Sequence, residues 1–140
     1  MQVHCLTTPK QMLAAFEVMS HMYPDLSQDE FLELLAGMVH KGYSMIGVID
    51  EQGKCIGAAG YWIGVRLYCR KFIQIDNLVV LPEKRGKQAG KMMMDEIKQI
   101  GREEGCQRVI LDTYVENFDA HRFFYREGFI IRGYHMNFIL

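Results

Sequence analysis

The apolar positions of the chain follow the helical period of three to four residues in four stretches. The predicted helices cover residues 8–19, 27–41, 91–104 and 117–127. The first two begin with a Ser or Thr that is followed three residues later by Gln or Glu (Thr8 with Gln11, Ser27 with Glu30), which is the pattern of a capping box. A glycine follows each of the last three stretches, as expected where a helix ends.

Short apolar runs lie between these helices and predict strands. The predicted strands cover residues 2–6, 43–50, 54–65, 70–81 and 108–115, and residues 129–140 form one or two more. The short turn at 51–53 joins the second strand to the third as a hairpin. The strands that begin at residues 70 and 108 flank a helix, so we expect them to be parallel. This order of elements predicts a mixed α/β (α+β) fold.

Length, charge and cysteine content narrow the class of protein. A chain of 140 residues fits one domain, residues 1–140, and 49% hydrophobic with 24% charged residues is ordinary for a globular fold. The net charge of −1 argues against a general nucleic-acid binder. We find no signal peptide and no apolar run long enough to span a bilayer, so we expect a cytoplasmic protein without nucleic-acid or membrane partners. The four cysteines form no C-x-x-C pair, so we expect no metal.

A basic, glycine-containing stretch, "RGKQAGK" (residues 85–91), stands where a predicted strand is followed by a helix. The first backbone N–H groups of a helix have no internal partner, and the helix dipole adds positive potential there. Arg85, Lys87 and Lys91 add charge, and glycines let the backbone approach a ligand. The stretch therefore indicates an anion site, with a plain solvated turn as the alternative interpretation.

Two nucleotide-binding motifs are excluded at this loop. A P-loop requires G-x-x-x-x-G-K-[ST], but Gly86 and Gly90 are too close in sequence and Met92 follows Lys91. The dinucleotide motif G-x-G-x-x-G is absent, and no acidic residue stands at the distance expected for a ribose contact. A phosphate bound here would belong to another kind of ligand.

Two stretches of the chain resemble the GCN5-related N-acetyltransferase (GNAT) family: "LVVLPEKRGKQAGKMMMDEI" and "NFDAHRFFYREGF". The family's loop reads Arg or Gln, two residues, Gly, one residue, and Gly or Ala. Arg85 and Gly90 match this pattern, and Gln88 replaces its middle glycine. The family's later element is matched by Asn117, Ala120, Phe123, Phe124, Gly128 and Phe129. The order of elements is similar to that of the family over almost the whole chain.

The resemblance implies a GNAT-like mixed central sheet of about six to seven strands flanked by about four helices, with a splayed parallel pair at the cofactor site. It also implies acetyl-coenzyme A as co-substrate. The pyrophosphate would lie on the loop, where a Cβ at Gln88 limits φ, and the pantetheine arm would pair with the preceding strand like an added strand. The implied cofactor-binding residues are Leu78, Val79, Val80, Arg85, Gly86, Lys87, Gln88, Ala89, Gly90, Lys91 and Asn117.

The implied reaction is direct attack of a primary amine on the acetyl thioester, for which the amine must first lose a proton. Asp76 stands where many family members carry Glu and is our first choice for the base, with Asp112 second. Family members often use a Tyr of the aromatic pair as the acid for the leaving thiolate. Phe124 occupies that place here, so Tyr125, one position later, is the candidate acid. Each carboxylate has a structural or solvated role as its alternative.

The acceptor is expected to be a small-molecule or peptide amine. Residues 1–42 hold only two bases, Lys10 and Lys41, but five acids: Glu17, Asp25, Asp29, Glu30 and Glu33. This acidic balance favours a cationic acceptor. Tyr61, Trp62 and Tyr68 are aromatic candidates for an acceptor site, although core packing is the better interpretation. The alternative functions are a catalytically weak domain that binds acetyl-coenzyme A as a sensor or for a partner, and transfer of a longer acyl chain. The chain is expected to be a monomer or a homodimer.

Overall fold

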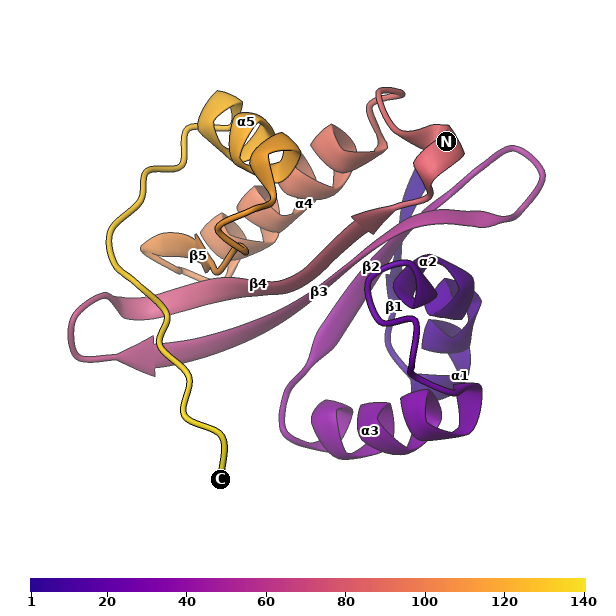
Figure 1. The fold of residues 1–140 in the computed structure, drawn as a ribbon, viewed down its shortest axis with the longest axis horizontal. Helices are drawn as coiled ribbons and strands as arrows, with labels where there is room; N and C mark the ends of the chain where they lie inside the picture. The colour runs from indigo at the N-terminus through magenta and orange to yellow at the C-terminus, as the bar shows by residue number, and fades with distance from the viewer. The chain divides into compact units, whose positions relative to one another are not determined.

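The structure is a computed structural model that describes residues 1–140, shown as a ribbon in Figure 1. Its elements, in chain order, are β1 (Gln2–Leu6), α1 (Pro9–Met12), η1 (Leu13–Ala15), α2 (Phe16–Ser20), α3 (Gln28–His40), β2 (Ser44–Ile49), β3 (Cys55–Arg66), β4 (Arg70–Val80), η2 (Pro82–Lys84), α4 (Ala89–Glu103), β5 (Arg108–Leu111) and α5 (Phe118–Arg126). The residues group into two compact units, Met1–Ile110 and Leu111–Leu140. No helix is both long enough and apolar enough to cross a membrane.

A five-stranded sheet with the strand order β1-β2-β3-β4-β5 organises the first unit. The pairs β1/β2, β2/β3 and β3/β4 are antiparallel. A backbone hydrogen bond from Asp50 N to Lys54 O (2.9 Å) closes the turn between β2 and β3, which confirms the predicted hairpin. Helix α4 connects β4 to β5, so the sheet is mixed, as the predicted β-α-β unit requires.

Helices cover both faces of this sheet within the first unit. Figure 1 shows α4 on one side of β3 and β4 and the helices α1 to α3 on the other. Alternation along β3 agrees, because a Cβ on Gly57 would meet Met93 of α4, whereas one on Gly60 would meet Tyr43. The helical period places Met93, Ile97 and Ile100 of α4 inward; Met93 and Ile97 are fully buried, and Ile100 is half-buried. Each fully buried side chain stabilises the fold by about 1.5–3 kcal/mol.

Two predicted helices have boundaries that differ from the prediction. The segment predicted as a single helix over residues 8–19 is α1, the 3-10 turn η1 and α2 in succession, although the Thr8–Gln11 capping box at its start is present. Helix α4 begins at Ala89 and not at Lys91. Gln88 has a φ of 69°, and this left-handed residue ends the loop and lets the helix start earlier.

The predicted C-terminal strands are absent, so the sheet has five strands and not six to seven. Residues 129–140 contain no regular element, and the last predicted strand before them, 108–115, is only β5 (Arg108–Leu111). From Ile130 onward the apolar residues of the C-terminal segment are exposed, with Phe138 at 88% and Ile139 at 92%. Apolar alternation predicts which residues fit a sheet, but a strand also needs a partner for its backbone groups.

Helix α5 of the second unit follows the prediction closely. Asn117 caps it by accepting a hydrogen bond from Ala120 N on its side-chain Oδ1 (3.2 Å). Gly128 ends it in the left-handed conformation (φ 92°), and Gly128 N donates to Tyr125 O (3.1 Å). These are the residues that a helix with an Asn N-cap and a Gly C′ requires.

Candidate active site

Strand β4 carries the centre of the candidate site, at a point where its pairing with β3 changes register. Gly60 lies opposite Asn77, but Tyr61 lies opposite Ile75, so Asp76 has no partner residue on β3. This is a β-bulge, which interrupts the usual alternation of side chains along a strand. Asp76 and Asn77 are adjacent in sequence, and the bulge allows both side chains to reach groups on one face of the sheet.

Two tyrosines hold the side chain of Asn77. Tyr43 Oη donates a hydrogen bond to Asn77 Oδ1 (2.6 Å), and Asn77 Nδ2 donates to Tyr23 Oη (2.5 Å). Burial raises the pKa of Tyr43 well above its ordinary value, and the negative charge of Asp76 adds to the effect. Tyr43 therefore stays protonated and remains a donor to Asn77.

Trp62 connects Asp76 to the same group of residues. Trp62 Nε1 donates a hydrogen bond to Asp76 Oδ2 (3.2 Å), and the Trp62 ring lies 5.2 Å from the ring of Tyr43. Five side chains are thus linked in what we call the bulge cluster: Tyr23, Tyr43, Trp62, Asp76 and Asn77. The bulge cluster lies wholly within the first compact unit.

A glycine on β3 makes room for the bulge cluster. A Cβ on Gly60 would lie 1.7 Å from Tyr43 Oη and 2.6 Å from Asn77 Oδ1, which no structure tolerates without movement. The hydroxyl of Tyr43 therefore occupies the space that a side chain at position 60 would need. Glycine is required here for a close approach and not for its backbone conformation.

Strand β4 continues from the bulge into Leu78–Val80, the segment expected to pair with pantetheine. On one side these residues pair with β3, where Leu78 lies opposite Ala59 and Val80 opposite Gly57. On the other side, β5 begins next to Lys71, since Gln107 N donates to Lys71 O (2.8 Å), and β5 has only four residues. A strand of that length ends before Leu78. The β4–β5 ladder therefore does not extend to Leu78–Val80.

The loop between β4 and α4 presents backbone donors. Gly86 and Gln88 both have positive φ, 74° and 69°. The first backbone bond within α4 runs from Met92 N to Gln88 O (2.9 Å), and the Gln88 side chain makes no capping bond. The N–H groups of Ala89 and Gly90 consequently have no acceptor inside the helix, which is the arrangement that binds anions at helix N-termini. Gln88 adopts this left-handed conformation despite its Cβ, at the position where the family's loop pattern has glycine.

Acidic side chains partly offset the positive charges of this loop. Lys84 Nζ lies 4.0 Å from Asp50 Oδ2, and Lys91 Nζ lies 2.6 Å from Asp95 Oδ1. The pKa of Asp50 is lowered, mainly by a hydrogen bond from the backbone N–H of Lys54. Arg85 Nε donates to Val80 O (3.4 Å). Lys87 is exposed and, with Lys84, borders a depression of about 230 Å³.

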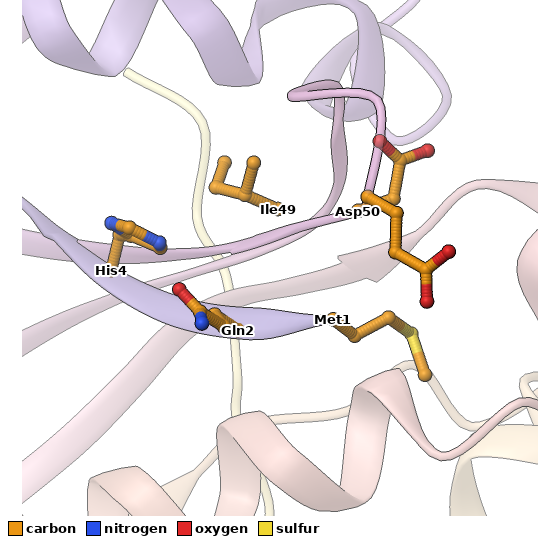
Figure 2. A pocket seen from close by; sticks show the side chains of 6 residues that line it. Met1, Gln2, His4, Ile49 and Asp50 are labelled. Carbon is orange, nitrogen blue, oxygen red and sulfur yellow. The ribbon is translucent and has the colours of Figure 1, made fainter.

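A second depression, of about 240 Å³, lies beside β1 and the end of β2. Figure 2 shows its labelled side chains, among them His4 and Asp50, spread along these strands without converging on one point. None of its lining residues belongs to the bulge cluster. No group of three His, Cys, Asp or Glu side chains is placed to hold a metal ion anywhere in the chain.

The remaining predicted site residues, Asp112, Asn117 and Tyr125, belong to the second unit. We expected Asp112 within a strand, but it lies after the end of β5. Its Oδ2 is 3.0 Å from His135 Nδ1. The pKa of His135 is raised, first by a hydrogen bond with Asn137 and then by Asp112. Asn117 caps α5, and Tyr125 is exposed on that helix.

Sequence reasoning missed three members of the bulge cluster: Tyr23, Tyr43 and Asn77. A signal for the bulge was present, because Asp76 and Asn77 place two polar residues in succession in an apolar strand. Of the aromatic candidates, Tyr61 is a buried core residue as expected. The core prediction is wrong for Tyr68, which is 62% exposed.

Comparison with known proteins places the chain among acetyltransferases. The model of the Acetyltransferase (GNAT) family matches residues 12–129, which include the bulge, the loop and α5. The uncharacterized N-acetyltransferase YhdJ of Bacillus subtilis (strain 168) is 27% identical over 130 residues, covering 92% of each chain. The aminoalkylphosphonate N-acetyltransferase of Salmonella typhimurium is 32% identical over 80 residues, which is 56% of this chain and 52% of that protein.

A similar fold occurs in a solved structure. The aminoglycoside N-acetyltransferase AAC(6')-Iy in complex with CoA superposes with a TM-score of 0.85, covering 99% of this chain and 93% of that one. The sequence identity is 16%, so this likeness concerns the fold.

Proposed function

The chain belongs to the acetyltransferase (GNAT) family and is an acyl-CoA-dependent N-acetyltransferase, and on this premise we propose that it acetylates a primary amine of a small molecule or peptide by direct attack. One observation carries the proposal. The bulge that holds the Asp76 carboxylate directly precedes the Leu78–Val80 segment, which the β4–β5 ladder does not reach, and the uncapped start of α4 follows after the loop.

The residues of the first unit fit acetyl-CoA. The N–H groups at the start of α4, with Gly86 and Gln88 in positive φ, suit a pyrophosphate. Lys84, Arg85, Lys87 and Lys91 supply charge, and Leu78, Val79 and Val80 supply main-chain groups for the pantetheine arm. Asn117 is proposed as a further contact. Acetyl-CoA supplies the acetyl thioester that the amine attacks.

The proposed reaction converts an ammonium and a thioester into an amide and a thiol. Asp76 accepts a proton from the ammonium, and the amine nitrogen then forms a bond to the carbonyl carbon. A backbone N–H of the Leu78–Val80 segment polarises the carbonyl oxygen. The carbon–sulfur bond breaks, and Tyr125 protonates the leaving thiolate. The nitrogen loses two protons in all, of which the thiol keeps one and solvent receives the other.

Asp112 is the second candidate base. Its carboxylate lies beside His135, so it has a local partner that accounts for its position. Asp76 has no such basic partner and receives its one hydrogen bond from Trp62. We therefore keep Asp76 as the base.

The test is acetyl transfer from acetyl-CoA to a panel of polyamines, aminoglycosides, amino acids and short peptides. Products are identified by mass spectrometry, because the exposed thiol of Cys5 would add background in a thiol assay. We expect Asp76→Asn to lower kcat by about 100-fold or more while the Kd for acetyl-CoA stays unchanged. Glu103→Gln, which alters an exposed carboxylate at the far end of α4, is the matched control.

Two results would overturn parts of this proposal. Binding of acetyl-CoA without acetylation of any amine would indicate a sensor or partner domain. A wild-type rate in Asp76→Asn would remove Asp76 from the mechanism, and Asp112→Asn would then be tested. Tyr125→Phe is expected to lower kcat by a smaller factor than Asp76→Asn, because a thiolate is a fairly stable leaving group.

A further inference from the structure

We infer that Trp62 forms a cation subsite with Asp76 in the bulge cluster: its indole N–H positions the Asp76 carboxylate, and its ring face attracts the positive charge of the acceptor amine. This inference rests on the proposed function, because it assigns the amine end of the same site. It adds roles for Trp62, Tyr43 and Asn77, which the proposed reaction does not use.

The two members of the bulge cluster on β4 lie next to the place where the acetyl group is proposed to bind. The segment Leu78–Val80 is proposed to hold the pantetheine arm, and the acetyl group lies at the end of that arm. The bulge at Asp76 and Asn77 directly precedes this segment. An amine that attacks the acetyl carbon must approach close to these two side chains.

The Asp76 carboxylate and the Trp62 indole are groups that attract a positive charge. Asp76 is exposed, and no basic side chain of the protein pairs with it. Its Oδ2 accepts from Trp62 Nε1 (3.2 Å), which orients the carboxylate, while Trp62 is only partly buried. A carboxylate accepts hydrogen bonds from an ammonium, and the face of an indole ring attracts a cation. Together they form a site for a positive charge that the chain itself does not fill.

Hydrogen bonds and ring packing hold the surroundings of Trp62 and Asp76 in place. Asn77 bonds both Tyr43 (2.6 Å) and Tyr23 (2.5 Å), and the ring of Tyr43 lies 5.2 Å from that of Trp62. Tyr43 is 4% exposed, so the indole packs on a fixed wall. A site whose supporting groups are locked by hydrogen bonds keeps the geometry that proton transfer needs.

The segment tied down by Tyr23 adds negative charge. Tyr23 lies between α2 and α3, and its hydroxyl is bonded to Asn77 of β4. Asp25 lies two positions further along this segment and is exposed. Among the acids of residues 1–42, Asp25 is thus the closest in sequence to a member of the bulge cluster, and a negative charge beside the cluster favours a cation.

Binding is tested first, without catalysis. Trp62 is the single tryptophan of the chain, so its fluorescence reports on this subsite. The probes are 1,4-diaminobutane and 1,4-butanediol, which have equal length but differ in charge, each added to the protein alone and with CoA bound. Excitation is at the red edge, where adenine does not absorb. We expect a saturable change with the diamine, none with the diol, and loss of the response in Asp76→Asn.

Two outcomes of the binding test overturn the inference. One is an equal response to the diamine and the diol. The other is no saturable response to the diamine, either in the protein alone or with CoA bound.

The role of Trp62 is tested by separating kcat from KM with the best amine of the panel. Trp62→Phe keeps an aromatic face but loses the N–H, so we expect kcat to fall by about 10-fold with KM nearly unchanged. Trp62→Leu loses both, so KM should also rise by about 5- to 30-fold. Tyr134→Leu, at an exposed aromatic residue of the C-terminal segment, is the matched control and should behave as wild type.

The failures of the two proposals are distinguishable. No turnover of any amine by the wild-type protein counts against the proposed function. Turnover with wild-type kcat and KM in Trp62→Leu overturns only the present inference. Circular dichroism and the Kd for acetyl-CoA show whether Trp62→Leu is misfolded. If it is, Trp62→Phe decides, and a wild-type kcat in Trp62→Phe removes the positioning role.

Discussion

The two ends of the candidate site are built in opposite ways. The bulge cluster joins side chains that are far apart in sequence, since the bonds of Asn77 to Tyr43 and Tyr23 span 34 and 54 residues. The loop from Pro82 to Lys91 is one continuous segment that acts through its backbone N–H groups and two positive φ angles. The proposed acceptor end therefore depends on the whole fold of the first unit, and the proposed donor end depends on local chain conformation.

Specificity for the donor and specificity for the acceptor would therefore reside in different parts of the chain. Backbone donors at a helix start bind a pyrophosphate whatever the neighbouring side chains are, so such a loop can be shared by proteins that use the same donor. A side-chain cluster such as the one around Asp76 can differ from chain to chain without altering the loop. Three substitutions test this division between loop and cluster.

The largest effect is expected for Gly60→Ala, which breaks the bulge cluster from within. The new Cβ would lie 1.7 Å from Tyr43 Oη and 2.4 Å from its Cζ, so the ring or the strand must move. We expect the free energy of unfolding to fall by about 2–3 kcal/mol, measured by urea denaturation. Gly37→Ala is the control, because its Cβ meets nothing within 4 Å in helix α3. It should stabilise the protein by about 1 kcal/mol. Equal effects at the two positions would show that Gly60 tolerates a side chain.

A smaller effect is expected for Asn77→Leu, which keeps a side chain of similar size but removes the amide. The buried hydroxyl of Tyr43 then loses its acceptor, which costs about 1–3 kcal/mol of stability. Adding Tyr43→Phe to this variant removes the orphaned hydroxyl and should restore part of the loss. The measurement is a double-mutant cycle by denaturation. Strictly additive effects would contradict the coupling between the two side chains.

The smallest effect concerns the loop, and it should have the opposite sign. Gln88→Gly removes the Cβ from a residue at φ 69°, where a non-glycine residue costs about 1–2 kcal/mol. Part of that gain is lost to the greater entropy of unfolded glycine, so we expect stability to rise by about 0.5 kcal/mol. The Kd for acetyl-CoA, measured by calorimetry, should be equal or lower.

Gln88→Ala is the control for this substitution, because alanine keeps the Cβ and should bring no gain. A loss of stability in Gln88→Gly would show that the Gln88 side chain supports the loop. That outcome would weaken the distinction between a loop made by its backbone and a cluster made by its side chains.

The sequence predicts the local parts of the molecule and not the long-range ones. Thr8, Ser27 and Asn117 start helices as their capping patterns indicate, because a cap depends only on the next three residues. The hairpin after β2 and the loop at Arg85 follow for the same reason.

The bulge at Asp76 and the contacts of Tyr23 and Tyr43 depend on how distant segments pack, which periodicity does not contain. The C-terminal strands fail for a related reason. The alternation in residues 129–140 shows that a strand is possible, but it names no partner strand.

Two carboxylates already pair with lysines near the start of α4, and this pairing affects how fast a bound CoA dissociates. Lys84 and Lys91 already lie beside Asp50 and Asp95, so a pyrophosphate bound as proposed would exchange one anionic partner for another. The two carboxylates remain close by and repel the phosphates once these are bound. Binding should therefore be weaker than the count of basic residues suggests, and the spent carrier should dissociate quickly and leave the loop ready for the next round.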